Sequence, residues 1–319
     1  MSTTLEFERG AGSKLHVEVV AEGLHFPEGP IAMSDGSVVL VEIQRQSLTR
    51  VHPDGKCEVI AHLGGGPNGA AIGPDGKVYV TNNGGFQWAT RPDGVTAPHG
   101  KPADYKSGSI QRVDLASGKV ETVYDACDER PLRGPNDLVF DRTGGFWFTD
   151  LGKSDGDMMQ MGHLLYARPD GSKIVRVREG MITPNGVGLS PDEKTVWVAE
   201  TYTSRVWGFE IARPGELAQS VDMWAPGRVL GPLPGYQLLD SLAVDAAGKV
   251  CAATIVNGGI TAFDPDGSTE HFAVPNDPIV TNICFGGPDM RDAWITSSGR
   301  GLLLKTRWPR PGLKLNFNA

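Results

Sequence analysis

Residues 135 to 150 read Pro135-Asn136-Asp137-Leu138-Val139-Phe140-Asp141-Arg142-Thr143-Gly144-Gly145-Phe146-Trp147-Phe148-Thr149-Asp150. Asn136 opens an apolar run, Gly144 follows eight positions later, and a second apolar run ends on Asp150. Short apolar runs on either side of a turn glycine predict two antiparallel strands. The stretch is therefore predicted to form a hairpin with Asn136 and Asp150 at the same end.

The same pattern occurs six times along the chain. The polar residue that opens each copy, which we call the anchor, is Glu28, Asn68, Asn136, Asn185, Asp240 or Asn282. Eight positions later stand Gly36, Gly76, Gly144, Glu193, Gly248 and Met290. The second apolar runs end on Glu42, Asn82, Asp150, Glu200, Thr254 and Thr296.

Repeats at intervals of about 40 to 70 residues match the four-stranded blades of a propeller better than the shorter repeats of a solenoid. The sequence thus predicts an all-β, six-bladed β-propeller over residues 15–319, preceded by an N-terminal tail over residues 1–14. We expect residues 15–20 to close the ring by adding an outer strand to the last blade, beside residues 302–305. Insertions are expected at 84–108 and 151–162, and whether they form a lid stays open.

The composition narrows the class of partner. The formal net charge is -8 for 319 residues, which argues against nucleic acid and anionic membranes as partners. The polar N-terminus lacks the apolar segment of a secretory signal, so we expect a cytoplasmic protein. The four cysteines are widely spaced and are expected to be reduced and buried. The sequence does not indicate an oligomeric state.

If the first strand of each blade is innermost, the six anchors surround one mouth of the central channel. Two buried carboxylates and four amides are unfavourable there unless a cation compensates the charge. Oxygen ligands without His or Cys favour a hard ion, so one divalent cation is predicted, with calcium preferred over magnesium or manganese and zinc less suited. Each anchor taken alone could instead be a turn or strand-entry residue.

A second ring of polar residues ends the second strands at the same mouth. Asn82, Asp150 and Glu200, together with Glu42, could bind a substrate's hydroxyl groups or orient the metal ligands. They could equally be solvated strand ends, and the sequence does not separate these alternatives.

Several motifs resemble the senescence marker protein / gluconolactonase / luciferin-regenerating enzyme family. They are Phe26-Pro27-Glu28-Gly29-Pro30, Gly134-Pro135-Asn136-Asp137-Leu138-Val139, Pro184-Asn185-Gly186 with Ser190-Pro191-Asp192, and the stretches 146–150 and 308–313. The resemblance runs from about residue 18 to the C-terminus. It implies a six-bladed propeller with one catalytic divalent ion.

The resemblance implies metal ligation by Glu28, Asn185 and Asp240, with Asn136 as a further ligand or a substrate contact. Some members hold the substrate with an Arg two residues before the Asn136 position. Here Gly134 takes that place and Arg133 comes one residue earlier, which weakens the inference to a particular sugar lactone.

The predicted function is that of a lactonase, a metal-dependent hydrolase that opens a lactone ring, with a sugar aldonolactone as the expected small-molecule substrate. The ion would polarise the carbonyl and activate water, and Asp240 is the candidate catalytic base. Two alternatives stay open. One is a phosphotriesterase or organophosphate hydrolase that uses the same metal, and the other is a non-catalytic binding propeller stabilised by the ion.

Overall fold

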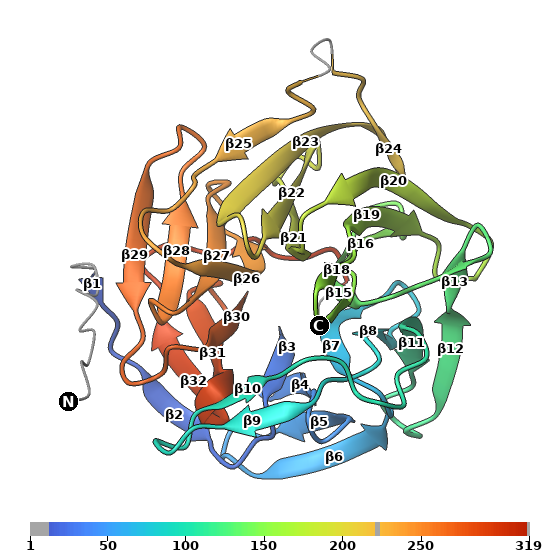
Figure 1. Ribbon diagram of the computed structural model, residues 1–319. Helices are drawn as coiled ribbons and strands as arrows, with labels where there is room; N and C mark the ends of the chain where they lie inside the picture. Colours follow the sequence, from blue (N-terminus) through green and yellow to red (C-terminus); the bar gives the residue numbers. More distant parts are fainter. Residues whose placement is uncertain (1–12, 221–223, 318–319) are drawn as a thin grey trace.

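The six predicted hairpins form the inner strands of six antiparallel sheets arranged around an axis as the blades of a propeller (Figure 1). The structure is a computed structural model that describes residues 13–220 and 224–317. Apart from the short 3₁₀ helix η1 (Ser298–Arg300), the regular elements of these residues are all β-strands. The prediction of an all-β six-bladed propeller is therefore confirmed.

In every blade the strands run outward from the channel. Blade 1 contains β3 (Pro27–Ala32), β4 (Val38–Glu42), β5 (Ser47–Val51) and β6 (Cys57–His62). Blade 2 contains β7 (Pro67–Ile72), β8 (Val78–Asn82), β11 (Ser109–Val113) and β12 (Val120–Tyr124). Blade 3 contains β15 (Pro135–Phe140), β16 (Phe146–Asp150), β19 (Gly162–Ala167) and β20 (Ile174–Met181).

The other three blades follow the same order with variations at the outer edge. Blade 4 contains β21 (Pro184–Leu189), β22 (Thr195–Glu200) and β23 (Arg205–Arg213), with β24 (Glu216–Leu217) and β25 (Arg228–Leu230) both paired to β23. Blade 5 contains β26 (Leu238–Val244), β27 (Val250–Ile255), β28 (Gly259–Phe263) and β29 (Thr269–Ala273). Blade 6 contains β30 (Val280–Gly286), β31 (Asp292–Ser297), β32 (Leu302–Arg307) and the N-terminal β2 (Glu18–Ala21).

The N-terminal segment adds strands to two outer edges. β2 pairs antiparallel with β32, with Glu18 opposite Lys305. The preceding β1 (Ser13–Lys14) pairs in parallel with β29 of blade 5. Of the predicted tail over residues 1–14, residues 13 and 14 form β1, and residues 1–12 lie outside the described part of the chain.

The turns of the hairpins share one backbone conformation. Gly36, Gly76, Gly144 and Gly248 all have φ between 72° and 88°. The two residues that replace glycine in this position, Glu193 and Met290, also have positive φ, at 57° and 56°. The turn geometry is thus kept in all six blades, although side chains other than glycine adopt it with strain.

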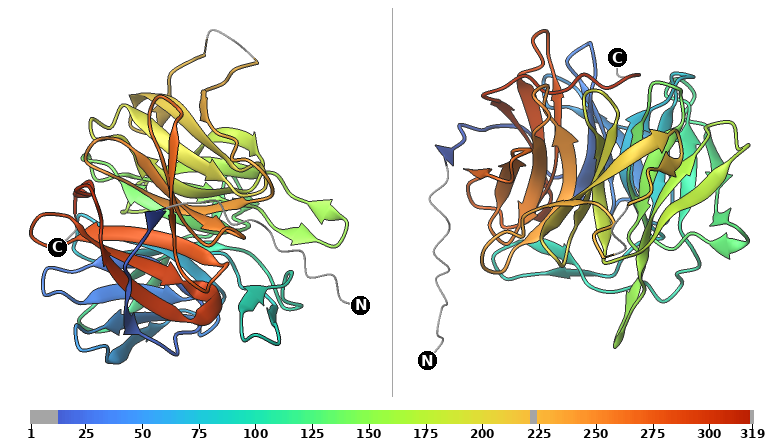
Figure 2. Two further views of the ribbon diagram at one scale, coloured as in Figure 1. Left: turned by 90° about the vertical axis from the view of Figure 1, so that its left-hand side faces the viewer. Right: turned by 90° about the horizontal axis from the view of Figure 1, so that it is seen from above.

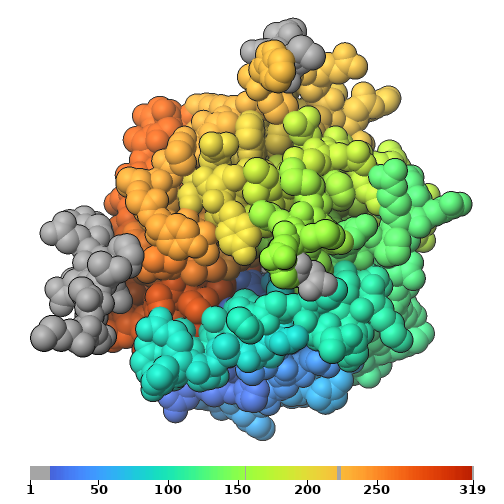
Figure 3. Space-filling model, viewed as in Figure 1, coloured from blue at the N-terminus to red at the C-terminus, as the bar shows by residue number. Residues whose placement is uncertain are grey.

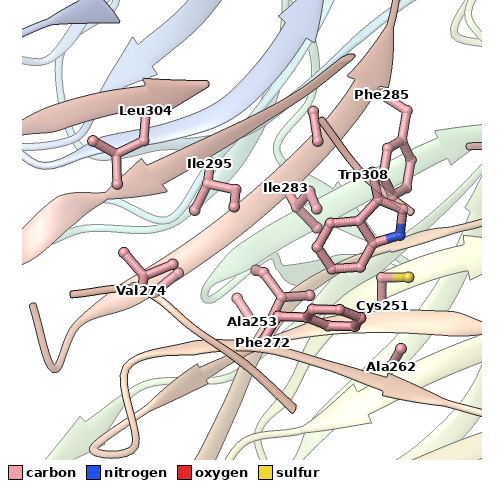
Figure 4. Packing of buried hydrophobic residues seen from close by; sticks show 13 residues of the cluster. Cys251, Ala253, Ala262, Phe272, Val274, Ile283, Phe285, Ile295, Leu304 and Trp308 are labelled. Atoms are coloured by element: carbon pink, nitrogen blue, oxygen red, sulfur yellow. The ribbon is translucent and has the colours of Figure 1, made fainter. Parts of the chain in front are cut away.

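A separate apolar cluster fills each interface between neighbouring blades. Between blades 5 and 6, Trp308 from the segment after β32 packs on Phe272 with ring centroids 4.4 Å apart (Figure 4). Of the four free cysteines, Cys127 and Cys251 are buried in such clusters. Cys57 is exposed on β6, which corrects the expectation that all four are buried.

The two ends of the channel differ. On one side the chain adds the hairpin β9 (Trp88–Thr90) with β10 (Thr96–Pro98) and the hairpin β17 (Ser154–Asp155) with β18 (Met158–Met159). The C-terminal segment crosses the other side (Figure 2), where Leu313 and Leu315 line an internal cavity of about 80 Å³. Small strands β13 (Ala126–Cys127) and β14 (Arg130–Pro131) pair beside blade 3. Among the described residues there is no helix long and apolar enough to cross a bilayer.

Candidate functional site

Every blade has an irregularity in strand pairing at its anchor. The register between first and second strands shifts at Glu28, at Asn136 and at the four equivalent positions. A β-bulge leaves its extra residue out of the ladder and turns its side chain in a new direction. The repeated bulge explains why six polar side chains can gather on the inner strands of an otherwise apolar fold. We call the six anchors the inner ring.

Glycines beside the anchors allow the blades to approach one another closely. A Cβ at Gly29 would lie 2.6 Å from the backbone nitrogen of Ala70, and one at Gly186 would lie 2.6 Å from that of Leu242. Such distances are too short for any side chain at these positions. The Glu-Gly and Asn-Gly pairs of the sequence are therefore required by the packing of first strand against first strand around the axis.

Glu28 is 2% exposed and has one carboxylate oxygen without a partner. Its Oε2 accepts hydrogen bonds from the backbone N–H of Gly29 and from Asn282 Nδ2, both at 2.7 Å. Its Oε1 is buried and accepts no hydrogen bond. Burial raises the pKa of this carboxyl to about 7, although both hydrogen bonds act in the opposite direction.

Asp240 lies in the same electrostatic environment but is only partly buried. Loss of solvent raises the pKa of its carboxyl well above the usual range, and the negative charge of Glu28 adds to this rise. A hydrogen bond with Asn185 opposes it. Each carboxylate therefore disfavours ionisation of the other, and the largest causes of the two pKa shifts include no positively charged residue.

Asn136 and Asn185 are buried and held by threonines that sequence reasoning missed. Thr81 Oγ1 donates to the carbonyl of Asn136, and Thr149 Oγ1 donates to that of Asn185, each across a blade boundary at 2.5 Å. Asn185 Nδ2 donates to Thr201 Oγ1 at 3.1 Å, whereas Asn136 Oδ1 is buried and has no partner. The sequence does repeat a Thr immediately before Asn82 and Asp150, a signal that could have identified these contacts.

The other two anchors have different surroundings. Asn282 donates to Glu28 and accepts the backbone N–H of Ile283, so its amide is already engaged on both sides. Asn68 is buried at 5% exposure. Asn282 thus positions Glu28 in the ring.

Asp137 is a third carboxylate at the centre, and it was not among the predicted site residues. Its two oxygens accept the backbone N–H groups of Leu138 at 2.9 Å and of Val187 at 3.3 Å. Burial, followed by the charge of Glu28, raises its pKa to about 8. Asp137 therefore links blade 3 to blade 4 directly beside the inner ring, and its ionisation is disfavoured in the same way as that of Glu28.

The residues at the ends of the second strands, which we call the outer ring, are buried and bonded to backbone. Asp150 accepts the N–H groups of Arg133 at 2.8 Å, Gly134 at 2.7 Å and Gly152 at 3.0 Å. Glu200 and Asn82 accept the N–H groups of Ile182 and Gly66, respectively, both at 2.8 Å.

These bonds hold the loops that lead into the innermost strands. The possibility of solvated strand ends is wrong for these residues, because all three side chains are at most 5% exposed. Their predicted role as substrate contacts gains no support from this geometry, because their oxygen atoms already accept hydrogen bonds.

The insertion 84–108 extends over part of the mouth. Trp88 packs on Phe26 of the loop before blade 1, with ring centroids 4.9 Å apart, and Arg300 of η1 donates to the carbonyl of Asp93. The Tyr105 hydroxyl donates to the carbonyl of Arg133 at 2.6 Å. Arg133 itself is exposed. The insertion thus runs from blade 2 past blade 1 to blade 6.

Lys153 fastens the beginning of this insertion and was also missed. Its Nζ donates to the carbonyl of Gly85 at 2.8 Å and to Asn83 Oδ1 at 3.3 Å, and lies 4.0 Å from the ring centroid of Phe86. Burial lowers the pKa of this amine to about 7. A buried lysine could not be predicted here from the sequence, because the contact depends on how two distant loops fold together.

The inner ring has the properties of a cation site made of oxygen atoms. Two buried acceptors, Glu28 Oε1 and Asn136 Oδ1, have no donor, and two carboxylates have raised pKa values. Among residues 13–220 and 224–317, no three His, Cys, Asp or Glu side chains form a metal-binding group. The ring is a different donor set, two carboxylates with amides, which fits a hard divalent cation.

The chain is similar in sequence to known lactonases. Residues 26–299 match the model of the SMP-30/Gluconolactonase/LRE-like region. A gluconolactonase from Zymomonas mobilis is 26% identical over 300 residues, covering 85% of this chain and 76% of that protein. Lactonase drp35 from Staphylococcus saprophyticus is 26% identical over 255 residues, covering 79% and 70% of the two chains.

The solved structure of a gluconolactonase from Xanthomonas campestris superposes with a TM-score of 0.71 at 22% identity, over 93% of this chain and 92% of that one. The match of the family model extends through all six anchors and both rings. The chain belongs to the SMP-30/gluconolactonase/LRE-like family.

Proposed function

We propose that the protein is a divalent-metal-dependent hydrolase that opens a lactone ring. The observation that carries this proposal is the pair of buried, unpartnered acceptors Glu28 Oε1 and Asn136 Oδ1 in a ring with Asp240. Unsatisfied buried acceptors are unfavourable unless a ligand completes them. The names of the relatives, gluconolactonase and lactonase, supply the reaction class.

Glu28, Asn185 and Asp240 would hold the cation, with Asn136 as a fourth ligand or as a substrate contact. A divalent cation there supplies Lewis-acid polarisation of an ester carbonyl and lowers the pKa of water. Calcium fits the all-oxygen donor set best, followed by magnesium and manganese, and then zinc.

Asp240 is the proposed general base. It is the less buried of the two carboxylates, so water and substrate can reach it, and it would accept the proton of the attacking water. The side-chain amides of Asn136 and Asn185 lie on neighbouring inner strands and would stabilise the negative charge that develops on the carbonyl oxygen. Asn282 would hold Glu28 in place, with its negative charge next to the cation. The antiparallel pairing of β2 with β32 would close the ring that keeps these groups in place.

The test is acid release from a lactone panel by chelator-stripped protein, with calcium, magnesium, manganese or zinc then added back. The panel includes glucono-δ-lactone, because the Zymomonas relative makes an aldonolactone the first class to assay. Protein-free samples correct for spontaneous ring opening. Turnover that depends on one ion supports the proposal.

An aryl phosphotriester is assayed in parallel. Hydrolysis of the phosphotriester without lactone turnover would support the alternative of a phosphotriesterase. Tight ion binding with no turnover of either the lactones or the phosphotriester would support the alternative of a non-catalytic binding propeller.

A further inference from the structure

Large apolar side chains are exposed mainly in one part of the surface. The described residues include eleven exposed large hydrophobic side chains, and six of them lie in loops at one end of blades 3, 4 and 5. We call these six the apolar rim: Met158, Met159, Met161, Ile182, Tyr202 and Tyr236. Within the rim, Met158 and Tyr236 are the most exposed, at 67% each. Grouped apolar exposure of this kind marks binding surfaces.

The loops that carry the rim are bonded to one another. Met161 and Ile182 directly flank the paired residues Gly162 and Met181 of β19 and β20. The backbone N–H of Tyr202 donates to Thr183 Oγ1 at 3.1 Å. The next loop joins through Ser204, whose hydroxyl donates to the carbonyl of Gln237. These bonds link the loops that carry the rim from blade 3 to blade 5.

The rim lies at the mouth that carries the inner ring. Its loops connect strand ends at the pairs Pro184–Glu200 and Asp150–His163, which is the end where the anchors begin their strands. The hairpin β17–β18 projects from the same side as the insertion 84–108, and the C-terminal segment lies on the opposite side (Figure 2). Seen from this side, the space-filling surface has a hollow at its centre (Figure 3).

The side chains of the outer ring offer few free polar atoms to a sugar at this mouth. Asn82, Asp150 and Glu200 bind backbone N–H groups. Position 134 admits no side chain, because a Cβ there would lie 2.4 Å from the carbonyl oxygen of Gly152. Methionine is flexible and polarisable, and tyrosine offers a broad apolar face, so this rim suits a hydrocarbon group better than a polyol.

We propose that the substrate is a lactone with a hydrophobic alkyl substituent, which rests on the apolar rim while the ring carbonyl reaches the inner ring. This inference rests on the proposed lactonase function and narrows its substrate class. Each methylene that the rim removes from water strengthens binding about fourfold. Contact with the rim should not strengthen the binding of glucono-δ-lactone in this way, because its hydroxyl groups would lose water without gaining hydrogen-bond partners.

The test compares δ-valerolactone, δ-octalactone and δ-decalactone with glucono-δ-lactone as substrates of the metal-loaded protein. We expect kcat/KM to rise about fourfold per added methylene, mainly through KM. Combined Met158→Gln, Met159→Gln and Met161→Gln substitutions should flatten this rise and leave kcat/KM for δ-valerolactone unchanged. Tyr236→Ser should reduce in part the rise of kcat/KM with chain length. Val59→Gln, at an exposed position on β6, is the matched control and should retain the full rise of kcat/KM with chain length.

A flat series in the native protein, or a preference for glucono-δ-lactone, would overturn the inference while leaving the lactonase assignment intact. The same holds for a slope that survives the triple substitution. If size-exclusion chromatography shows a dimer that the triple variant abolishes, together with a flat series, the rim is an interface between copies. Failure to hydrolyse even δ-valerolactone would overturn the proposed function itself.

Discussion

The inner and outer rings lie at the same mouth and are built from the same kinds of side chain, yet their oxygen atoms have opposite surroundings. In the outer ring, Asp150 accepts three backbone N–H groups. In the inner ring, Glu28 Oε1 and Asn136 Oδ1 accept none. The difference indicates that the outer ring stabilises the loops, whereas the inner ring keeps acceptors ready for a ligand.

Asp240→Asn is the sharpest test of the inner ring. It removes the proposed base while keeping the size of the side chain, so we expect kcat on the lactone substrate to fall about 1,000-fold. Stability without metal should be unchanged or higher, because the substitution removes repulsion from Glu28. Steady-state kinetics and thermal unfolding by circular dichroism measure the two effects. Retention of a tenth of the native kcat would exclude Asp240 as the base.

Asp150→Asn makes the same chemical change in the outer ring and should have the opposite result. An amide cannot accept three backbone N–H groups as a carboxylate does, so we expect the free energy of unfolding to fall by about 3 kcal/mol. The folded fraction should retain kcat within a few-fold. Urea unfolding, with kinetics below the transition, checks both. A full loss of kcat with native stability would mean that Asp150 acts on the substrate.

The sequence predicted the hairpins and their turns, because alternation and turn residues such as Gly144 act locally. It also predicted that both rings share one mouth. It could not tell the two rings apart, because the donors that occupy Asp150 come from the loop at Arg133 and Gly134, across the hairpin. The contacts of Lys153 could not be predicted from the sequence for the same reason, since its partners lie in another blade.

When a chelator keeps the inner ring free of cations, the free energy of unfolding should depend on pH through Glu28. The pKa of Glu28 is raised to about 7 from an ordinary value of 4.5, so its stabilising effect is complete below pH 4.5 and is lost as pH rises through 7. With EDTA we expect the free energy of unfolding to fall by about 2 kcal/mol between pH 5 and pH 7.5. Saturating calcium should offset this fall.

Urea titrations at several pH values, with EDTA or with calcium, provide the measurement. Glu28→Gln is the matched variant and should show a weaker fall and little response to calcium. Equal pH dependence in the native protein and in this variant would show that Glu28 does not carry the effect.

Lys153 extends the comparison to a buried cation at the same mouth, and its pH dependence should have the opposite sign. Burial lowers its pKa from 10.5 to about 7, so between these values the unfolded chain binds more protons and stability rises with pH. We expect an increase of about 1 kcal/mol from pH 7 to pH 8 with calcium present. Lys153→Met should remove this increase, whereas Lys56→Met, at an exposed position, should retain it. If urea titrations give the same increase in Lys153→Met, the contacts with Gly85 and Phe86 hold the amine protonated at neutral pH, and the lysine fastens the insertion as a permanent charge.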